Sequence, residues 1–198
     1  MTTRFFKETK KLNASFLPFG ANEIACKPID KQLTEVLFIG SCDLRRIFLL
    51  ERIQDKVTIF GDRWLRNYSL ISDPLKSKIN DQEIWGAALY QQLADAKIVL
   101  NITRSHFYGV ETGVNLRIFE ALAAGCFLLT DYCEELEQMF VIGEEIEVFR
   151  NASELADKVD FYLNNLEKRQ AIAKRGHEKF LNSHTWQIRA KSINKLVS

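Results

Sequence analysis

The sequence predicts an α/β protein built on a Rossmann-like, doubly wound parallel sheet with extra C-terminal helices. Three observations predict this fold. From about residue 32, short apolar runs alternate with helix-length segments, which is the order of a parallel sheet whose crossovers are helices. The runs are continuously apolar, as expected of strands buried on both faces. A composition of 46% hydrophobic and 27% charged residues in a chain of 198 fits one globular unit.

Five apolar runs are expected to form the strands, with helix-length segments between them. The strands are expected at Val36–Ile39, Val57–Phe60, Ile98–Leu100, Phe127–Thr130 and Glu147–Phe149. The helices are expected at Leu44–Ile53, Leu89–Ala96, Leu116–Ala124 and Glu134–Phe140. Between the second strand and Leu89 the pattern predicts a loop.

Three further helices are expected to close the chain. Apolar residues recur at helical spacing at Leu155, Val159, Tyr162 and Leu166, and again at Trp186, Ala190, Ile193 and Val197. The third of these helices lies between them, at Glu167–Leu181. Ser153 is expected to cap the first, because a hydroxyl at that place accepts a hydrogen bond from a first-turn N–H.

The first 31 residues differ in character from the rest. Phe16–Gly20 and Cys26–Pro28 combine aromatic and cysteine residues with proline and glycine, which indicates an extended connector rather than a domain. We therefore expect residues 1–31 to be a connector and residues 32–198 to form the folded domain, closing helices included.

Charge and hydropathy exclude two classes of partner. The 27 Lys and Arg residues against 26 Asp and Glu give a net charge of +1, so no bulk field marks a nucleic-acid binder. No apolar run approaches the roughly 18 to 20 residues of a transmembrane helix. The start, Met1–Glu8, has no apolar stretch before a small-residue cleavage site, so a cytoplasmic location is expected.

The four cysteines, Cys26, Cys42, Cys126 and Cys133, are far apart and form no Cys-x-x-Cys pair. This spacing predicts neither a zinc site nor a disulfide framework. Cys126 follows Gly125 in an apolar stretch, where a thiol acts as a small hydrophobic group, although a nucleophile is the alternative.

Candidate site residues follow the first two strands, because ligands of open parallel sheets bind beyond the carboxyl ends of the strands. Gly40 and Ser41 come after the first strand, and Arg45 and Arg46 open the next helix. This combination suits a phosphate group; the alternative is that both arginines are ordinary solvated helix charges. Trp64, after the second strand, is a candidate either for packing or for stacking on a ligand.

The densest polar cluster follows the third strand, from Asn101 to Asn115, and includes Arg104 and His106. Free N–H groups at the start of the next helix would let Gly113, Val114 and Asn115 cradle a diphosphate, with Arg45 or Arg46 opposite. Further along that helix, Arg117 precedes Glu120. Glu120 could accept hydrogen bonds from a sugar diol or be an exposed or ion-paired carboxylate. His106 is a candidate acid or base in a loop.

One ordered set of motifs makes the chain similar to a known family. The set is Phe38–Ser41, Arg45–Arg46, Phe60–Asp62 with Trp64, Leu100–Asn101, Asn115–Ala121, Ala124–Gly125, Leu129–Asp131, Gly143–Glu145 and His184–Trp186. From about Leu17 to its end, the chain resembles the C-terminal half of group 1 glycosyltransferases, in particular the branch of spore maturation proteins called CgeB-like. The block Asn-Leu-Arg-x-Phe-Glu-Ala is the most specific part.

The resemblance implies a GT-B glycosyltransferase, in which two Rossmann-like domains face one another and the C-terminal one holds the nucleotide-sugar donor. It implies that Glu120 binds the donor ribose and that residues 113–115 meet the diphosphate. Arg45 or Arg46 would neutralise the leaving group in a retaining transfer that needs no metal or other cofactor. Gly40, Ser41 and Arg117 would also belong to the donor site, and the region of Trp85 would hold the base.

The resemblance also implies that residues 1–31 lead from an N-terminal acceptor domain that the 198 residues do not include. The acceptor, whether a glycan, protein or small molecule, is not encoded in any motif. Two departures from the family pattern stand out. Thr112 occupies the place of the first of two acidic residues, with Glu111 one step away, and Ser41 occupies the place of a basic residue.

Three functions compete on these grounds. The first is a donor domain that transfers sugar when an acceptor domain is present. The second is a non-catalytic module of the same fold that binds a nucleotide or a partner, as the missing half and Thr112 suggest. The third is a related nucleotide-sugar epimerase.

Overall fold

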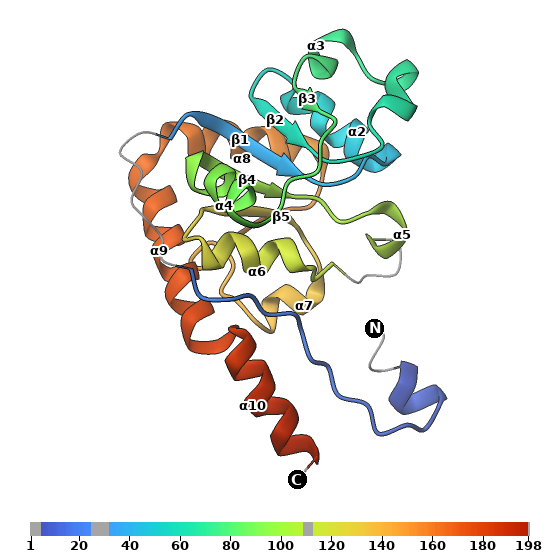
Figure 1. Cartoon of the computed structure of the whole chain (residues 1–198), viewed down its shortest axis with the longest axis vertical. Helices are drawn as coiled ribbons and strands as arrows, with labels where there is room; N and C mark the ends of the chain where they lie inside the picture. Colours follow the sequence, from blue (N-terminus) through green and yellow to red (C-terminus); the bar gives the residue numbers. More distant parts are fainter. Residues whose placement is uncertain (1–4, 25–31, 109–112, 198) are drawn as a thin grey trace.

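Six parallel strands form one sheet within residues 5–24, 32–108 and 113–197, the parts of the chain that the computed structural model describes (Figure 1). The strands are β1 (Thr34–Ile39), β2 (Val57–Phe60), β3 (Ile79–Asn80), β4 (Ala96–Asn101), β5 (Leu128–Asp131) and β6 (Glu147–Phe149). Their spatial order is β3-β2-β1-β4-β5-β6. The chain builds outward from β1 to one edge and from β4 to the other, so the expected doubly wound α/β fold is confirmed.

Helices cover both faces of this sheet. They are α2 (Leu44–Leu50), α3 (Asp73–Lys76), α4 (Gly86–Asp95), α5 (Ser105–Tyr108), α6 (Leu116–Ala123), α7 (Glu134–Glu137), α8 (Ala152–Asn164), α9 (Leu166–Ser183) and α10 (Trp186–Val197). Apolar side chains of α2 and α8 pack in the core on one face. Those of α4, α6 and α7 pack in the core on the other. Two layers of helix thus enclose the sheet.

The continuous apolar runs have a direct explanation in this packing. In β1, Val36 and Phe38 face the α2 and α8 side, whereas Leu37 faces the α4 and α6 side. In β4, Leu100 and Val99 divide in the same way. Because neighbouring residues of a strand point to opposite faces and both faces are buried, the central positions of these strands are continuously apolar, and polar residues occur toward the strand ends.

Several expected boundaries are corrected. The helix expected to reach Ile53 tightens into a 3-10 turn, η2 (Glu51–Ile53), and α7 ends at Glu137 rather than Phe140. Asn151, not Ser153, caps α8, because its side-chain oxygen accepts the N–H of Glu154 at 2.9 Å. Leu166 opens α9 instead of closing α8.

The loop expected between residues 60 and 89 is structured. It holds the 3-10 helix η3 (Leu65–Leu70), α3 and the two-residue edge strand β3. Ser72 caps α3, with its hydroxyl accepting from the N–H of Leu75 and with proline in the first turn. The short polar α5, after β4, was not expected either.

The N-terminal segment extends away from the sheet toward the same side as α10 (Figure 1). It begins with the single-turn π-helix η1 (Phe5–Thr9) and touches the body at a backbone bridge between Ala21 and Thr185. Arg189 of α10 donates to the carbonyl of Phe19 at 3.0 Å. This segment is therefore attached through α10, while its assignment as a connector stays a prediction. None of the helices in the described ranges has the length and apolar character needed to cross a bilayer.

Candidate functional site

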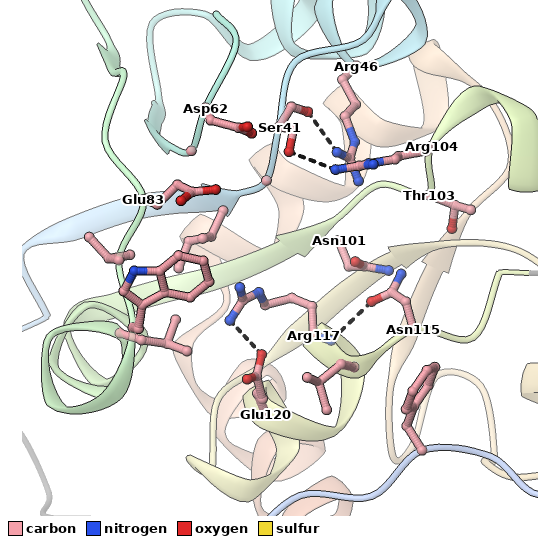
Figure 2. Close-up of a pocket in the computed structure, with 18 of the residues that line it drawn as sticks. Ser41, Arg46, Asp62, Glu83, Asn101, Thr103, Arg104, Asn115, Arg117 and Glu120 are labelled. Carbon is pink, nitrogen blue, oxygen red and sulfur yellow. Dashed lines mark hydrogen bonds and ion pairs between the residues drawn. The ribbon is translucent and has the colours of Figure 1, made fainter.

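A cavity of about 820 Å³ opens at the carboxyl ends of the two central strands (Figure 2). Its walls come from the loops after β1, β2, β3 and β4 and from the N-terminal parts of α4 and α6. They include Gly40, Ser41, Arg46, Gly61, Asp62, Glu83, Trp85, Tyr90, Asn101, Thr103, Arg104, Gly113, Val114, Asn115, Arg117 and Glu120. Since β1 and β4 are the strands from which the chain turns in opposite directions, the cavity lies at the switch point where open α/β sheets bind ligands.

Two glycines bring the first two loops together. Gly61 has a φ of +143°, and a Cβ there would overlap the carbonyl oxygen of Gly40. The same carbonyl accepts the indole N–H of Trp64 at 3.0 Å. Trp64 is fully buried and packs edge-on against Phe38, so of its two alternatives the structure supports packing.

The start of α6 is formed by residues that the sequence singled out. Asn115 caps the helix, its Oδ1 accepting the N–H of Arg117 at 3.1 Å and its Nδ2 donating to the carbonyl of Gly113 at 3.3 Å. A Cβ on Gly113 would lie 2.7 Å from the Sγ of Cys133, so only glycine lets this turn lie against α7. Gly113, Val114 and Asn115 all line the cavity, and the positive end of the α6 dipole points toward it.

One turn further, Glu120 and Arg117 form an ion pair in the cavity wall. The Nη1 of Arg117 donates to the Oε2 of Glu120 at 2.7 Å. Burial raises the pKa of Glu120 and Arg117 opposes the rise; burial likewise lowers the pKa of Arg117. Tyr90 of α4 lies close enough that burial and then Glu120 raise its pKa. The structure therefore gives the ion-paired alternative for Glu120, with the carboxylate facing the cavity where a diol could reach it.

Arg46 faces the cavity, and three of its five N–H groups bond to backbone carbonyls. Its Nε and Nη2 donate to the carbonyl of Ile102 at 3.0 and 2.6 Å, and its Nη1 donates to the carbonyl of Ser41 at 2.7 Å. Burial lowers the pKa of Arg46 to about 10. This guanidinium therefore ties the loop after β1 to the loop after β4.

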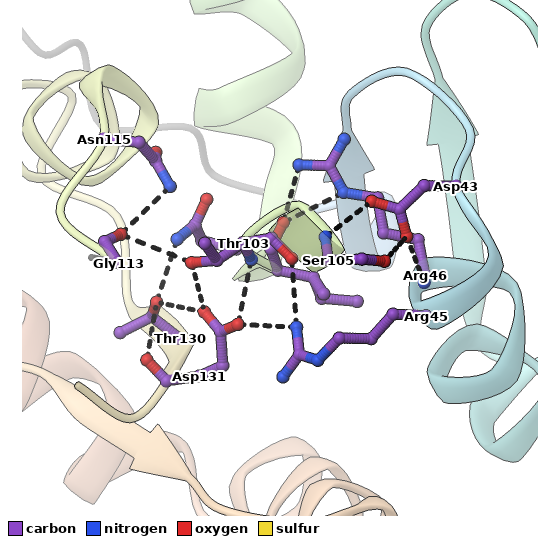
Figure 3. Close-up of polar contacts among 11 residues, drawn as sticks. Asp43, Arg45, Arg46, Thr103, Ser105, Gly113, Asn115, Thr130 and Asp131 are labelled. Atoms are coloured by element: carbon purple, nitrogen blue, oxygen red, sulfur yellow. Dashed lines mark hydrogen bonds and ion pairs between the residues drawn. The ribbon is translucent and has the colours of Figure 1, made fainter. Parts of the chain in front are cut away.

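Arg45 points toward Asp131 and Thr103 (Figure 3). Its Nη1 donates to the Oδ2 of Asp131 at 2.7 Å and to the carbonyl of Thr103 at 3.0 Å. The ring of Tyr108 covers the guanidinium at 3.6 Å. Arg45 is not among the cavity-lining residues, and neither it nor Arg46 is the solvated helix charge that was the alternative. Their part in neutralising a leaving group stays a prediction.

Trp85 stands at the rim of the cavity, 70% exposed. It occupies the N-cap position of α4 with an extended backbone and makes no side-chain cap bond. Gly86 follows with a φ of +54°, a left-handed conformation that turns the chain into the helix. An exposed indole at a cavity mouth can stack on a planar group. The expected contact of Trp85 with the base stays a prediction.

The remaining candidate groups lie outside the cavity. His106 is exposed on α5 against Phe107, and His177 bonds the carbonyl of Leu122 at 2.8 Å. Burial raises the pKa of Cys42 to about 11 and of Cys133 to about 12, while Cys126 donates to the carbonyl of Leu93. Cys26, Glu111 and Thr112 lie outside the described residues. Within the described ranges, no group of three His, Cys, Asp or Glu side chains could hold a metal ion.

Phe19, Glu83 and Tyr90 reach the cavity but were not expected from the sequence. Arg104 and Asp62 also line it; both belong to stretches that the sequence singled out after strand ends, but neither was given a role. Phe19 and Glu83 come from segments with no periodic pattern, and nothing in their sequence neighbourhood points to the cavity.

Comparison with protein families gives one assignment. The family model described as glycosyl transferase-like matches residues 45–195. No curated protein sequence matches the chain at a significant level.

Solved structures share the fold at low sequence identity. Sucrose-phosphate synthase from Thermosynechococcus elongatus superposes with a TM-score of 0.70 and 15% identity, covering 99% of this chain and 55% of that one. Anabaena HepE in complex with UDP and glucose superposes with a TM-score of 0.64 and 14% sequence identity, over 83% of this chain and 48% of HepE. A mutant of TarM from S. aureus was solved with fondaparinux, alpha-GlcNAc-glycerol and UDP. It superposes with a TM-score of 0.69 and 14% sequence identity, over 95% of this chain and 41% of TarM. The shared fold is that of GT-B glycosyltransferases, and the chain spans about half the length of these structures.

Proposed function

Because the chain belongs to the glycosyl transferase-like family, we propose that it is the donor-binding domain of a glycosyltransferase of the CgeB-like branch. It binds a nucleoside-diphosphate sugar in the cavity between β1 and β4. The sugar is transferred when an acceptor-binding domain closes the other side, and residues 1–31 serve as the connector from that domain. The ligands named with the similar structures, UDP and glucose among them, belong to those proteins and suggest the first compounds to try.

One observation carries the proposal. The N-terminus of α6 and the carboxylate of Glu120, a little more than one turn along the same helix, line one cavity at the switch point of the sheet. The helix terminus attracts a diphosphate through its dipole and free N–H groups. A carboxylate held in place by Arg117 accepts two hydroxyl groups of a ribose well. Diphosphate and ribose are neighbours in a nucleotide sugar, as the two groups are neighbours on α6.

The proposed chemistry is transfer with retention of configuration and without a metal. The bond between the anomeric carbon and the diphosphate oxygen breaks, and its electron pair stays on the diphosphate. The anomeric carbon bonds to the acceptor hydroxyl oxygen, whose proton passes to the departing diphosphate. Negative charge grows on the diphosphate in this step, and fixed guanidinium groups and helix N–H groups stabilise it there. Trp85 at the rim is proposed to stack on the base.

The test is nucleotide binding by the purified chain. We expect one of UDP, GDP, ADP or TDP, or its sugar conjugate, to raise the unfolding temperature equally with magnesium or with EDTA. At about 100 times its Kd a ligand stabilises a protein by about 2.7 kcal/mol. Glu120→Gln should lower the affinity for that ligand by about 10- to 100-fold, because hydrogen bonds to a charged group are lost.

Glu178→Gln is the matched control, since it removes the same charge from an exposed site on α9. It should leave nucleotide affinity unchanged. Failure of every nucleotide to bind would contradict the proposal. Binding without sugar transfer, even after an acceptor domain is supplied, would instead identify a non-catalytic nucleotide-binding module.

A further inference from the structure

Three guanidinium groups and three carboxylates line the cavity among the described residues. The cations are Arg46, Arg104 and Arg117, and the anions are Asp62, Glu83 and Glu120. If a diphosphate binds here, as proposed above, its charge needs a cation whose present bonds are easily exchanged. The hydrogen bonds of the three arginines separate them clearly.

Two of the three have stronger partners of their own. Arg46 donates three of its five N–H groups to the carbonyls of Ile102 and Ser41. It could move toward a phosphate only by giving up buried backbone acceptors, which costs free energy. Arg117 pairs with Glu120 at 2.7 Å, so its charge is already matched by an anion, although its buried Nε has no hydrogen-bond partner among the described residues.

Arg104 is different. Its one hydrogen bond in the described part of the chain is from Nη2 to the hydroxyl oxygen of Ser41, at 2.7 Å. That partner is neutral, and no ion pair to Arg104 is present within the described ranges. Figure 2 shows Arg104 beside Ser41 and next to Arg46. Arg46 and Arg104 repel, since the charge of Arg104 contributes to lowering the pKa of Arg46. An anion entering the cavity would relieve this repulsion.

The backbone of Arg104 is held firmly on both sides by aspartates. The N–H of Thr103 donates to the Oδ2 of Asp131 at 2.9 Å, and the N–H of Ser105 donates to the Oδ2 of Asp43 at 3.1 Å. Arg45 in turn fixes Asp131. Figure 3 shows these contacts as one continuous set. The side chain between the two anchored peptides has a defined origin, which reduces the entropy lost when it binds a ligand.

We propose that Arg104 is the residue that binds the diphosphate of the donor and that Arg45 is a positioning residue, acting through Asp131 and Thr103. On binding, Nη2 of Arg104 exchanges the Ser41 hydroxyl for a phosphate oxygen, and the other guanidinium N–H groups are available for a second one. A planar fork of this kind matches two phosphate oxygens. Ser41, which stands where the family pattern has a basic residue, thus holds an arginine from the neighbouring loop.

The experiment compares Arg104→Gln, Arg104→Lys and Arg66→Gln with the unmodified chain. Arg66 is exposed on η3, so Arg66→Gln removes the same charge far from the cavity. Calorimetry measures the Kd of UDP, GDP, ADP and TDP, and ligand-observed NMR measures the Kd of the matching nucleoside. We expect Arg104→Gln to weaken the bound diphosphate by about 10- to 100-fold and the nucleoside by less than about twofold. Arg104→Lys should recover part of the loss, and Arg66→Gln should change neither.

Arg45→Gln tests the positioning role. It should lower the affinity for the diphosphate relative to the nucleoside, by less than Arg104→Gln does, and Arg45→Lys should restore part of this ratio. A merely structural role would weaken both ligands together. Unfolding curves show whether each variant is folded. If Arg104→Gln does not fold, the Kd values of Arg104→Lys are compared with those of the unmodified chain instead.

Two results would overturn the inference, and they are distinguishable. If the unmodified chain binds a nucleoside diphosphate and Arg104→Gln binds it equally well, Arg104 is not the cation, whereas the donor site stands. If the unmodified chain binds no nucleoside diphosphate at all, the proposed function fails, and the role of Arg104 fails with it.

Discussion

Two sets of polar side chains meet at the carboxyl ends of the central strands and differ in how fully they are bonded. The floor set is Arg45, Arg46, Thr103 and Asp131, of which only Arg46 and Thr103 reach the cavity, and its side chains bond to a carboxylate or to backbone carbonyls. The wall set, Ser41, Arg104, Arg117 and Glu120, lines the cavity and bonds mainly to other side chains that line it. The comparison teaches that floor bonds maintain the shape, whereas wall bonds can be exchanged for a ligand.

The largest expected effect would break the floor. Asp131→Ala leaves the Arg45 guanidinium and the N–H and hydroxyl of Thr103 without their acceptor. Removing one partner of a buried, hydrogen-bonded pair costs about 3 to 5 kcal/mol. Urea unfolding measures the loss of stability directly. Asp157→Ala, at an exposed position of α8, should cost less than about 0.5 kcal/mol; an equal cost for the two variants would end the distinction between floor and wall.

A second, slightly smaller effect is expected from pH at a third polar cluster. Buried His184 accepts a hydrogen bond from Arg189, and burial followed by repulsion from Arg189 lowers the pKa of His184 from 6.5 to about 4. The neutral ring is favoured in the folded state, so its full stabilisation is present above pH 6.5. This stabilisation is lost as the pH falls from 6.5 through 4, and the free energy of unfolding decreases by about 3 kcal/mol in total.

The measurement is the urea midpoint at pH 7 and at pH 4, compared with His184→Gln, which cannot titrate. Carboxylates titrate in both proteins, so the difference between the two curves isolates the histidine. We expect the variant to lose less stability on acidification. Parallel curves would show that protonation of His184 is not resisted by the fold.

The smallest expected effect concerns the wall. Ser41→Ala removes the hydroxyl that accepts from Arg104 and that also bonds the Asp62 carboxylate, but leaves the Ser41 carbonyl that Arg46 holds. Hydrogen bonds to charged groups are worth about 1.5 to 3 kcal/mol when buried; at this partly exposed site we expect a loss of about 1 to 2 kcal/mol, below the cost of Asp131→Ala. Thermal or urea unfolding suffices to measure it. A loss as large as that from Asp131→Ala would place Ser41 with the floor.

Most of the fold could be predicted, because its signals are local. The apolar runs of β1, β2, β4 and β5 reflect burial on both faces, a property of each strand by itself. Strand β3 gave no such signal. It has two residues, Ile79 and Asn80, after Lys78, and it is held by backbone bonds such as the one from the N–H of Ile59 to the carbonyl of Lys78. Backbone bonds leave no trace in residue type.

The site divides along the same line. Gly113, Asn115 and Glu120 lie within eight residues, at the turn before α6, at its N-cap and on the helix itself, so local sequence alone brings them to one end of one element. The direction of Arg45 depends on Asp131, 86 residues later in the chain. Arg45 and Arg46 are adjacent and chemically identical, yet one turns toward Asp131 and the other toward the cavity. Only the acceptors that surround each of them decide this, and those come from β4 and β5.

The order of the sheet has a consequence for how the chain acquires its structure. Strand β1 pairs on one side with β2, which follows it closely, and on the other with β4, in a register that joins Thr34 to Ala96. Until β4 emerges from the ribosome, one edge of β1 has unsatisfied N–H and C=O groups flanked by Val36, Leu37 and Phe38. Open, apolar strand edges associate with one another, and parallel pairings over long separations form slowly. The interval before β4 appears is therefore when a nascent chain most needs a chaperone, and truncations between residues 61 and 95 should accumulate as aggregates.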